Sequence, residues 1–196
     1  MSTTGGETVE VTLAADELER LSAVADDPAA LLREAGMRRV LLEETIEATF
    51  GDHGDEGAPA EAIAGERPVA PIGATIGFEV VSAGDGAATV VLDAGPEHAN
   101  PMGTLHGGVL CDVGDAAMGI AYASTLGRDE SFTTLELHVN YLRPVWEDRL
   151  TAEGRVVNRG RTVGLVECDV RNEEAQLVAR LSSTCLTLRG EAAAGR

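Results

Sequence analysis

The sequence predicts an α+β fold in which one long buried helix is wrapped by a largely antiparallel sheet. Two observations carry this expectation. Residues 109–125 are apolar on nearly every side of a helix, which is typical of a helix buried inside a domain. Four strand-like runs follow this segment, separated by turn residues, and shorter strand-like runs precede it.

The chain begins with a helical region and a linker. Residues 13–49 carry apolar side chains at helical spacing, with Asp16 as the expected N-cap. The segment after them is rich in glycine, proline and acids, which is typical of a linker. We therefore expect four parts: a helical extension (1–50), a linker (51–70), the main domain (71–190) and a C-terminal tail (191–196).

The first run after the buried helix, SFTTLELHVNYLRP, alternates with a period of two. This alternation predicts a strand with one face on the core, formed by Leu135, Leu137, Val139 and Tyr141. The other face would carry Thr134, Glu136, His138 and Asn140. Further strands are expected over residues 149–158, 162–172 and 176–189, with turns at 159–160 and 172–175.

The charge balance argues against several classes of partner. The chain has 33 acids and 15 bases, every base is an arginine, and the formal net charge is −18. Binding to nucleic acid or to an anionic membrane is therefore unfavourable. Because the acids are spread along the chain, we favour a carboxylate-rich surface adapted to a salt-rich, halophilic cytoplasm over an acidic face for a basic partner.

Nothing in the sequence resembles a secretory signal or a membrane span, and the three cysteines lie far apart. Their number and spacing indicate neither a disulfide framework nor a metal site. We expect a reduced, cytoplasmic protein that binds no metal.

The densest chemical signal is HANPMGTLHGG, residues 98–108, directly before the buried helix. Gly107 and Gly108 stand where the helix begins, and without a Cβ they let a ligand approach the backbone closely. The first N–H groups of a helix have no intrahelical partner and carry the positive end of its dipole. They suit a carbonyl oxygen that becomes negative under attack, and Asn100 and His106 could add side-chain donors.

Asp115 is the leading candidate for the group that delivers water or attacks directly. A carboxylate on an otherwise apolar buried helix is unfavourable unless it has a partner or a task. Asp115 follows Gly107 by eight residues, about 12 Å along one helix. One carbonyl cannot contact both within a single chain, so we expect two copies to pack these helices antiparallel and to share the site.

The run NPMGTLHGGVLCDVGDAAMGIA, followed by a strand ending in NYLRP and then by RGRT, resembles the PaaI-like branch of hot-dog fold thioesterases. The resemblance covers about residues 72–189. It implies hydrolysis of acyl-CoA thioesters, with aryl, phenylacetyl and medium-chain acyl groups all open. It also implies a homodimer or a tetramer and no cofactor, since CoA enters only as part of the substrate.

The resemblance further implies roles for single residues. Gly107 would donate its N–H to the thioester carbonyl, with Asn100 and His106 lining the site. Asp115 of the neighbouring subunit would act as base or nucleophile, and Thr134 would help to place the water. The substrate-binding residues expected in addition are Gly108, Met118 beside the acyl group, and Arg159 and Arg161 near the CoA phosphates.

Several of these residues also have structural interpretations. His106 could be satisfied by backbone, Asn100 could close a turn, and Cys111 is expected to be a packed small residue. Asp112 stands where the family usually has a small or apolar residue. It either competes with Asp115 for the role of the acid or pairs with an arginine.

Two other functions fit parts of the sequence. One is a hydratase or dehydratase acting on acyl-CoA with the same fold. The other is a non-catalytic regulator that senses acyl-CoA, because the N-terminal residues faintly resemble a ribbon-helix-helix protein. Glu7 and Glu10 in its expected strand, and 16 acids against 5 arginines in residues 1–70, argue against DNA binding. We favour an extension that packs on the dimer or helps to build a tetramer.

Overall fold

The computed structural model describes residues 14–27, 29–33, 35–36 and 70–193, which belong to two compact units. None of the helices in these ranges has the length and apolar character that a bilayer crossing requires. The predicted linker, apart from residue 70, and the strand expected for a ribbon-helix-helix protein lie outside the described residues.

In the first unit, helix α1 spans Ala15–Val24, and residues 29–33 are also helical. The N-cap is Ala14, whose backbone N–H donates to the Glu17 carboxylate at 2.8 Å. The prediction of Asp16 as the N-cap is therefore wrong. Asp16 lies inside the helix. Glu17, three residues after the cap, accepts the backbone N–H at the helix start instead.

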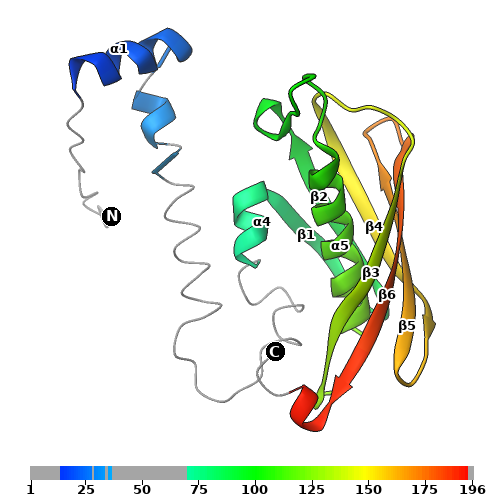
Figure 1. Cartoon of the computed structure of the whole chain (residues 1–196). Coiled ribbons are helices and arrows are strands. Elements are labelled where there is room, and N and C mark those ends of the chain that lie inside the picture. Colours follow the sequence, from blue (N-terminus) through cyan, green and yellow to red (C-terminus); the bar gives the residue numbers. More distant parts are fainter. Residues whose placement is uncertain (1–13, 28, 34, 37–69, 194–196) are drawn as a thin grey trace, which may run out of the picture. The chain divides into compact units, whose positions relative to one another are not determined.

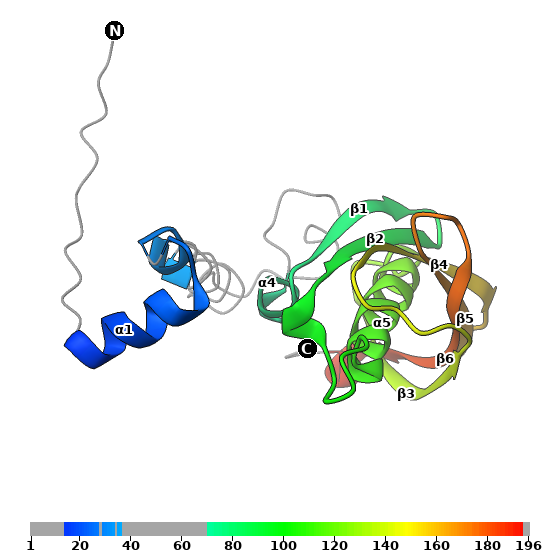
Figure 2. The same ribbon diagram turned by 90° about the horizontal axis from the view of Figure 1, so that it is seen from above.

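The second unit is an antiparallel sheet that curves around one helix, as Figures 1 and 2 show. Helix α5 spans Gly107–Ala123, and the short helix α4 spans Pro71–Ile76. The strands are β1 (Phe78–Gly84), β2 (Ala87–Ala94), β3 (Glu130–Tyr141), β4 (Asp148–Arg159), β5 (Val163–Arg171) and β6 (Leu177–Arg189). Their order in the sheet is β1-β2-β4-β5-β6-β3, so β1 and β3 form its edges. The predicted α+β architecture is confirmed.

Helix α5 lies directly against the sheet because the strand carries a glycine at the contact. Ala117 and Met118 of the helix are fully buried. On β4 they meet Gly154, where a Cβ would come within 2.9 Å of the Met118 backbone nitrogen and closer still to the Ala117 carbonyl. The missing side chain at Gly154 therefore sets the distance between helix and sheet.

A β-bulge at Leu135 changes which side chains of β3 face the helix. The pairing register with β6 shifts between Thr134 and Glu136. Thr134 faces α5 before the bulge, and Leu137 and Val139 pack against the core after it. Leu135 itself is 56% exposed. The prediction that put Leu135 on the core face and Thr134 on the other face is wrong, because the extra residue reverses the alternation.

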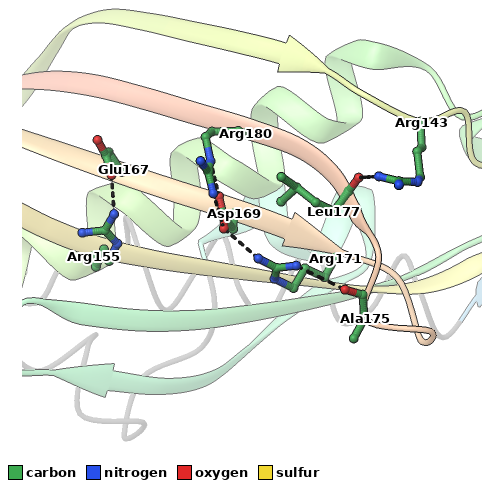
Figure 3. Close-up of polar contacts among 8 residues, drawn as sticks. All are labelled: Arg143, Arg155, Glu167, Asp169, Arg171, Ala175, Leu177 and Arg180. Carbon is green, nitrogen blue, oxygen red and sulfur yellow. Dashed lines mark hydrogen bonds and ion pairs between the residues drawn. The ribbon is translucent and has the colours of Figure 1, made fainter.

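The face of the sheet away from α5 carries a network of ion pairs, drawn in Figure 3. Asp169 on β5 accepts hydrogen bonds from Arg180 on β6 at 2.7 and 2.8 Å and from Arg171 at 3.0 Å. Arg155 on β4 pairs with Glu167 on β5. Exposed pairs of this kind contribute little to stability one by one. They show that arginines of this acidic chain form ion pairs with carboxylates on neighbouring strands.

We expect Gly154→Ala to lower the free energy of unfolding by about 1–3 kcal/mol, because the added methyl group meets helix backbone that cannot rotate away. Urea unfolding of the full chain measures this change. Gly127→Ala is the matched control, since a Cβ there has its nearest neighbour at 3.8 Å. An equal loss in both variants would contradict the close packing of α5 on β4.

Candidate active site

Two side chains hold the first turn of α5. His106 is the N-cap, and its Nδ1 accepts the N–H of Gly108 at 2.9 Å. The carbonyl of Gly107 accepts a hydrogen bond from the Tyr141 hydroxyl at 3.0 Å. The N–H of Gly107 has no acceptor within the described part of the chain. One donor at the positive end of the helix dipole is therefore available to a ligand.

A pocket of about 320 Å³ lies at this helix start. It is lined by Leu105, Gly107, Leu110, Tyr141, Leu142, Arg143, Pro144 and Val145. Most of these residues are apolar, so the pocket suits an apolar group beside the N–H of Gly107. Arg143 donates to the Leu177 carbonyl at 2.6 Å, a contact visible in Figure 3, which ties the segment after β3 to the start of β6.

Asn100 shapes the loop that leads into the helix. Its Oδ1 accepts the N–H of Met102 at 2.8 Å, and its Nδ2 donates to the Thr104 hydroxyl at 2.8 Å. Both ends of the side chain are thus used within the loop, as the structural interpretation expected. One hydrogen of its amide group is left for a ligand. The next residue, Leu105, donates its N–H to Val145 at 2.8 Å and so joins this loop to the wall of the pocket.

Asp115 and Thr134 meet beside the middle of α5. The Thr134 hydroxyl donates to Oδ1 of Asp115 at 3.4 Å. Partial desolvation raises the pKa of Asp115, the hydrogen bond from Thr134 lowers it, and the charge of Asp112 raises it, with a net rise above the ordinary value. Asp115 is nevertheless exposed in the single chain, so its carboxylate can reach a group outside it.

Asp112 lies three residues before Asp115 and differs from it in surroundings. It is exposed and makes no ion pair with any described residue. The hydrogen bond from Thr134 goes to Asp115. The arginine pairing that the sequence left open for Asp112 is therefore not found in the described ranges.

Arg159 is committed to contacts within the fold. Its side chain is 23% exposed and donates to Glu130 at 3.0 Å and to the Thr125 hydroxyl at 3.2 Å. Its guanidinium also lies over the ring of Tyr122, 5.0 Å from the centroid. These contacts tie the end of β4 to the start of β3 and to the C-terminal end of α5. They do not support the prediction of Arg159 as a ligand of the CoA phosphates.

Arg161 and Met118, two other predicted binding residues, lie in opposite surroundings. Arg161 is exposed, and its side chain makes no ion pair or hydrogen bond within the described residues, so its guanidinium can meet an anion. Met118 is 0% exposed and belongs to the core. Met118 lies on the side of α5 that faces the sheet, so it is not placed to contact an acyl group. This corrects the prediction that gave it that role.

Tyr141 is the residue of this site that the sequence did not single out. It was expected only on the core face of its strand. Its ring does face α5, yet it is 54% exposed at the pocket. Its hydroxyl also lies 3.1 Å from Sγ of Cys111. The one available signal was its position at the strand end, immediately before the pocket-lining segment 142–145.

Comparison with known proteins places the chain in a family. The model of the thioesterase superfamily matches residues 102–179. A 1,4-dihydroxy-2-naphthoyl-CoA hydrolase of Listeria monocytogenes is 31% identical over 104 residues, which cover 53% of this chain and 85% of that protein.

Two solved structures share the architecture. A phenylacetic acid degradation-related protein of Ralstonia eutropha is 28% identical, with a TM-score of 0.60 over 66% of this chain and 99% of that one. The PaaI protein of the Escherichia coli phenylacetic acid degradation operon is 22% identical and shows the same fold, with a TM-score of 0.59 over 67% and 92% of the two chains. The chain belongs to the thioesterase superfamily, as an enzyme of its PaaI-like hot-dog branch.

We expect Arg159→Gln to lower the free energy of unfolding by about 1.5–3 kcal/mol, because a partly buried Glu130 loses a charged hydrogen-bond partner. Arg161→Gln, the matched control, should stay within about 0.5 kcal/mol of the parent protein. Chemical denaturation of both variants measures the difference. A stable Arg159→Gln protein would show that Arg189, which also pairs with Glu130, holds this carboxylate without help from Arg159.

Proposed function

We propose that this protein hydrolyses acyl-CoA thioesters to the free acid and CoA, and that the acyl group is aryl, phenylacetyl or medium-chain. The observation that carries the proposal is the N–H of Gly107, which has no acceptor among the described residues and lies at the start of a buried helix beside an apolar pocket. The name of the Listeria relative, a naphthoyl-CoA hydrolase, supports an aryl group within this range.

The site requires two subunits in this proposal. Helix α5 is continuous from Gly107 to Ala123, so Gly107 and Asp115 remain about 12 Å apart along it. An antiparallel packing of two such helices would bring the partner's Asp115 to Gly107. The exposure of Asp115 and its position beside edge strand β3 support this arrangement, because a free edge can pair with the same edge of a second copy.

The chemistry follows from these positions. The N–H of Gly107 would polarise the thioester carbonyl and stabilise the negative oxygen that forms when the carbon is attacked. The partner's Asp115 would either take a proton from the attacking water or attack the carbonyl carbon itself. The C–S bond then breaks, and CoA leaves as a thiolate that takes up a proton. On the first route this step gives the free acid directly. On the second route the acyl group remains on Asp115 as an anhydride, and water must hydrolyse it to release the acid and restore the carboxylate. Thr134 would hold the carboxylate in place through its hydrogen bond.

The remaining residues would bind the substrate around the carbonyl. Gly108, His106 and Asn100 would border the acyl group from the helix start and the preceding loop. The missing side chain of Gly108 leaves room for the His106 ring, because a Cβ there would come within 2.9 Å of Nδ1 of His106. Arg161 has no side-chain partner in the described ranges and would meet a phosphate of CoA. No metal or cofactor takes part in the proposed reaction.

Asp115→Asn should lower kcat by about 100- to 10,000-fold, because the amide can neither accept a proton nor attack. Asp112→Asn is the matched control and should lose far less. Thiol release in high salt from benzoyl-, phenylacetyl-, hexanoyl- and palmitoyl-CoA measures both, with sedimentation to verify the dimer. A folded dimer that binds acyl-CoA and releases no thiol from any of the four would favour the sensor function instead.

The pH dependence should report the surroundings of Asp115. The enzyme needs the ionised carboxylate, so kcat/KM falls as the pH drops through its pKa, which is raised above the ordinary value near 4. Asp112→Asn removes a neighbouring negative charge and should shift the acidic limb to lower pH. Thr134→Val removes the hydrogen bond that lowers this pKa and should shift the limb to higher pH. Shifts in the same direction would show that Asp115 is not the titrating group.

A further inference from the structure

We propose that Tyr141 is a positioning residue of the hydrolysis, because its hydroxyl and its ring fix the first turn of α5 and thereby the direction of the Gly107 N–H. The inference rests on the proposed function at one point only, namely that this N–H receives the carbonyl oxygen of the substrate.

The Tyr141 hydroxyl bridges two groups one helical turn apart. It lies 3.0 Å from the carbonyl oxygen of Gly107 and 3.1 Å from Sγ of Cys111. A carbonyl oxygen can only accept, so the phenol donates its proton to Gly107. The phenol oxygen is then the acceptor for the thiol proton of Cys111. A chain of hydrogen bonds from Cys111 through Tyr141 to Gly107 therefore closes the first turn.

The phenol stays neutral at every ordinary pH. The neighbouring Cys111, followed by burial, raises the pKa of Tyr141 to about 12. The proton that the hydroxyl donates to Gly107 is therefore retained throughout the pH range in which the enzyme would work.

The ring of Tyr141 adds a second restraint. A Cβ at position 107 would lie 3.0 Å from Cζ of Tyr141 and 3.1 Å from its hydroxyl oxygen. The ring thus occupies the space that a side chain at Gly107 would need. Glycine at this position lets the ring rest directly on the helix start.

The peptide unit between Gly107 and Gly108 is held at both ends. Its carbonyl is bound by Tyr141, and its N–H is bound by His106. Because a peptide unit is planar, these two contacts fix its orientation. The Gly107 N–H belongs to the preceding peptide unit, whose carbonyl, that of His106, accepts the N–H of Val109 at 3.0 Å. With both neighbouring units held, the direction of the Gly107 N–H is restrained. A donor stabilises a developing oxyanion only within a narrow range of distance and direction. A restraint on the Gly107 N–H should therefore raise kcat.

The bulge in β3 allows Tyr141 to face helix α5 and to contact Gly107. Thr134 and Tyr141 are seven residues apart, and in a regular strand an odd separation puts two side chains on opposite faces. The bulge at Leu135 restores them to the same face. One strand therefore serves both Asp115 and Gly107.

Tyr141→Phe in the full-length protein tests the proposal, since it keeps the ring and removes both hydrogen bonds. We expect kcat to fall about tenfold, or about 1.4 kcal/mol in activation free energy, with KM changed less than about twofold. Cys111→Ser keeps a donor to the phenol oxygen and should retain most of kcat. An unchanged kcat in Tyr141→Phe would overturn the proposal.

Tyr122→Phe is the matched control. It removes a tyrosine hydroxyl from the other end of the same helix, where it bonds to the Thr187 hydroxyl at 2.8 Å in the core. This change should lower stability while leaving kcat near that of the parent. An equal fall of kcat in both variants would show a general loosening of the fold and would also overturn the proposal.

A second measurement separates this proposal from the proposed function. The amide resonances of Gly107 and Gly108, followed by nuclear magnetic resonance, report the helix start whether or not the protein hydrolyses anything. We expect both to move in Tyr141→Phe and to stay in place in Tyr122→Phe. Unmoved resonances in Tyr141→Phe overturn the positioning role. Moved resonances in a protein that releases no thiol leave the restraint in place and overturn the proposed hydrolysis.

Discussion

The contact between α5 and β4 is the constraint on which the rest of this structure depends. Gly154 lets the backbone of the helix rest on the sheet near Ala117. A helix seated in this way behaves as a rigid rod, so its start, its middle and its end each meet a fixed neighbour. The start meets Tyr141, the middle meets Thr134, and the segment after its end meets Arg159. The spacing of the candidate catalytic groups is thus a property of the packing, and a loop movement within one chain cannot shorten it.

The bulge in β3 is a second constraint of the same kind. It changes no element of the topology, yet it decides which side chains of the edge strand reach the helix. Without it, Thr134 and Tyr141 could not both face α5. The two acids of the helix differ for a related reason, because the strand supplies a hydroxyl to Asp115 and none to Asp112. Edge strand β3 therefore gives the carboxylates of Asp112 and Asp115 different surroundings, although the two groups are chemically identical.

The sequence predicted the features that depend on local pattern. The buried helix and the last three strands were expected to within two residues of their observed ends, because apolar periodicity and turn residues mark them directly. The bulge left only a slight mark in SFTTLELHVNY, where two threonines stand between Phe132 and Leu135 and break the alternation. Threonine is common on both faces of a strand, so this break was missed. Met118 lies on a helix that is apolar all round, so the pattern could not tell the side facing the sheet from a side facing a ligand. The ion pair of Arg159 could not be expected from the sequence, because its partner Glu130 is 29 residues away.

The cap at the start of α5 also determines where the proton of His106 resides. A backbone N–H can only donate, so Nδ1 of His106 must offer its lone pair to Gly108. The neutral imidazole therefore exists as the tautomer with hydrogen on Nε2. Protonation at Nδ1 would break the cap, and Nε2 has no lone pair with which to take a proton. While this cap is made, the ring presents a donor at Nε2 towards a substrate oxygen and has no free lone pair. A general base needs such a lone pair, and this is the role that a histidine would have in a hydration of acyl-CoA.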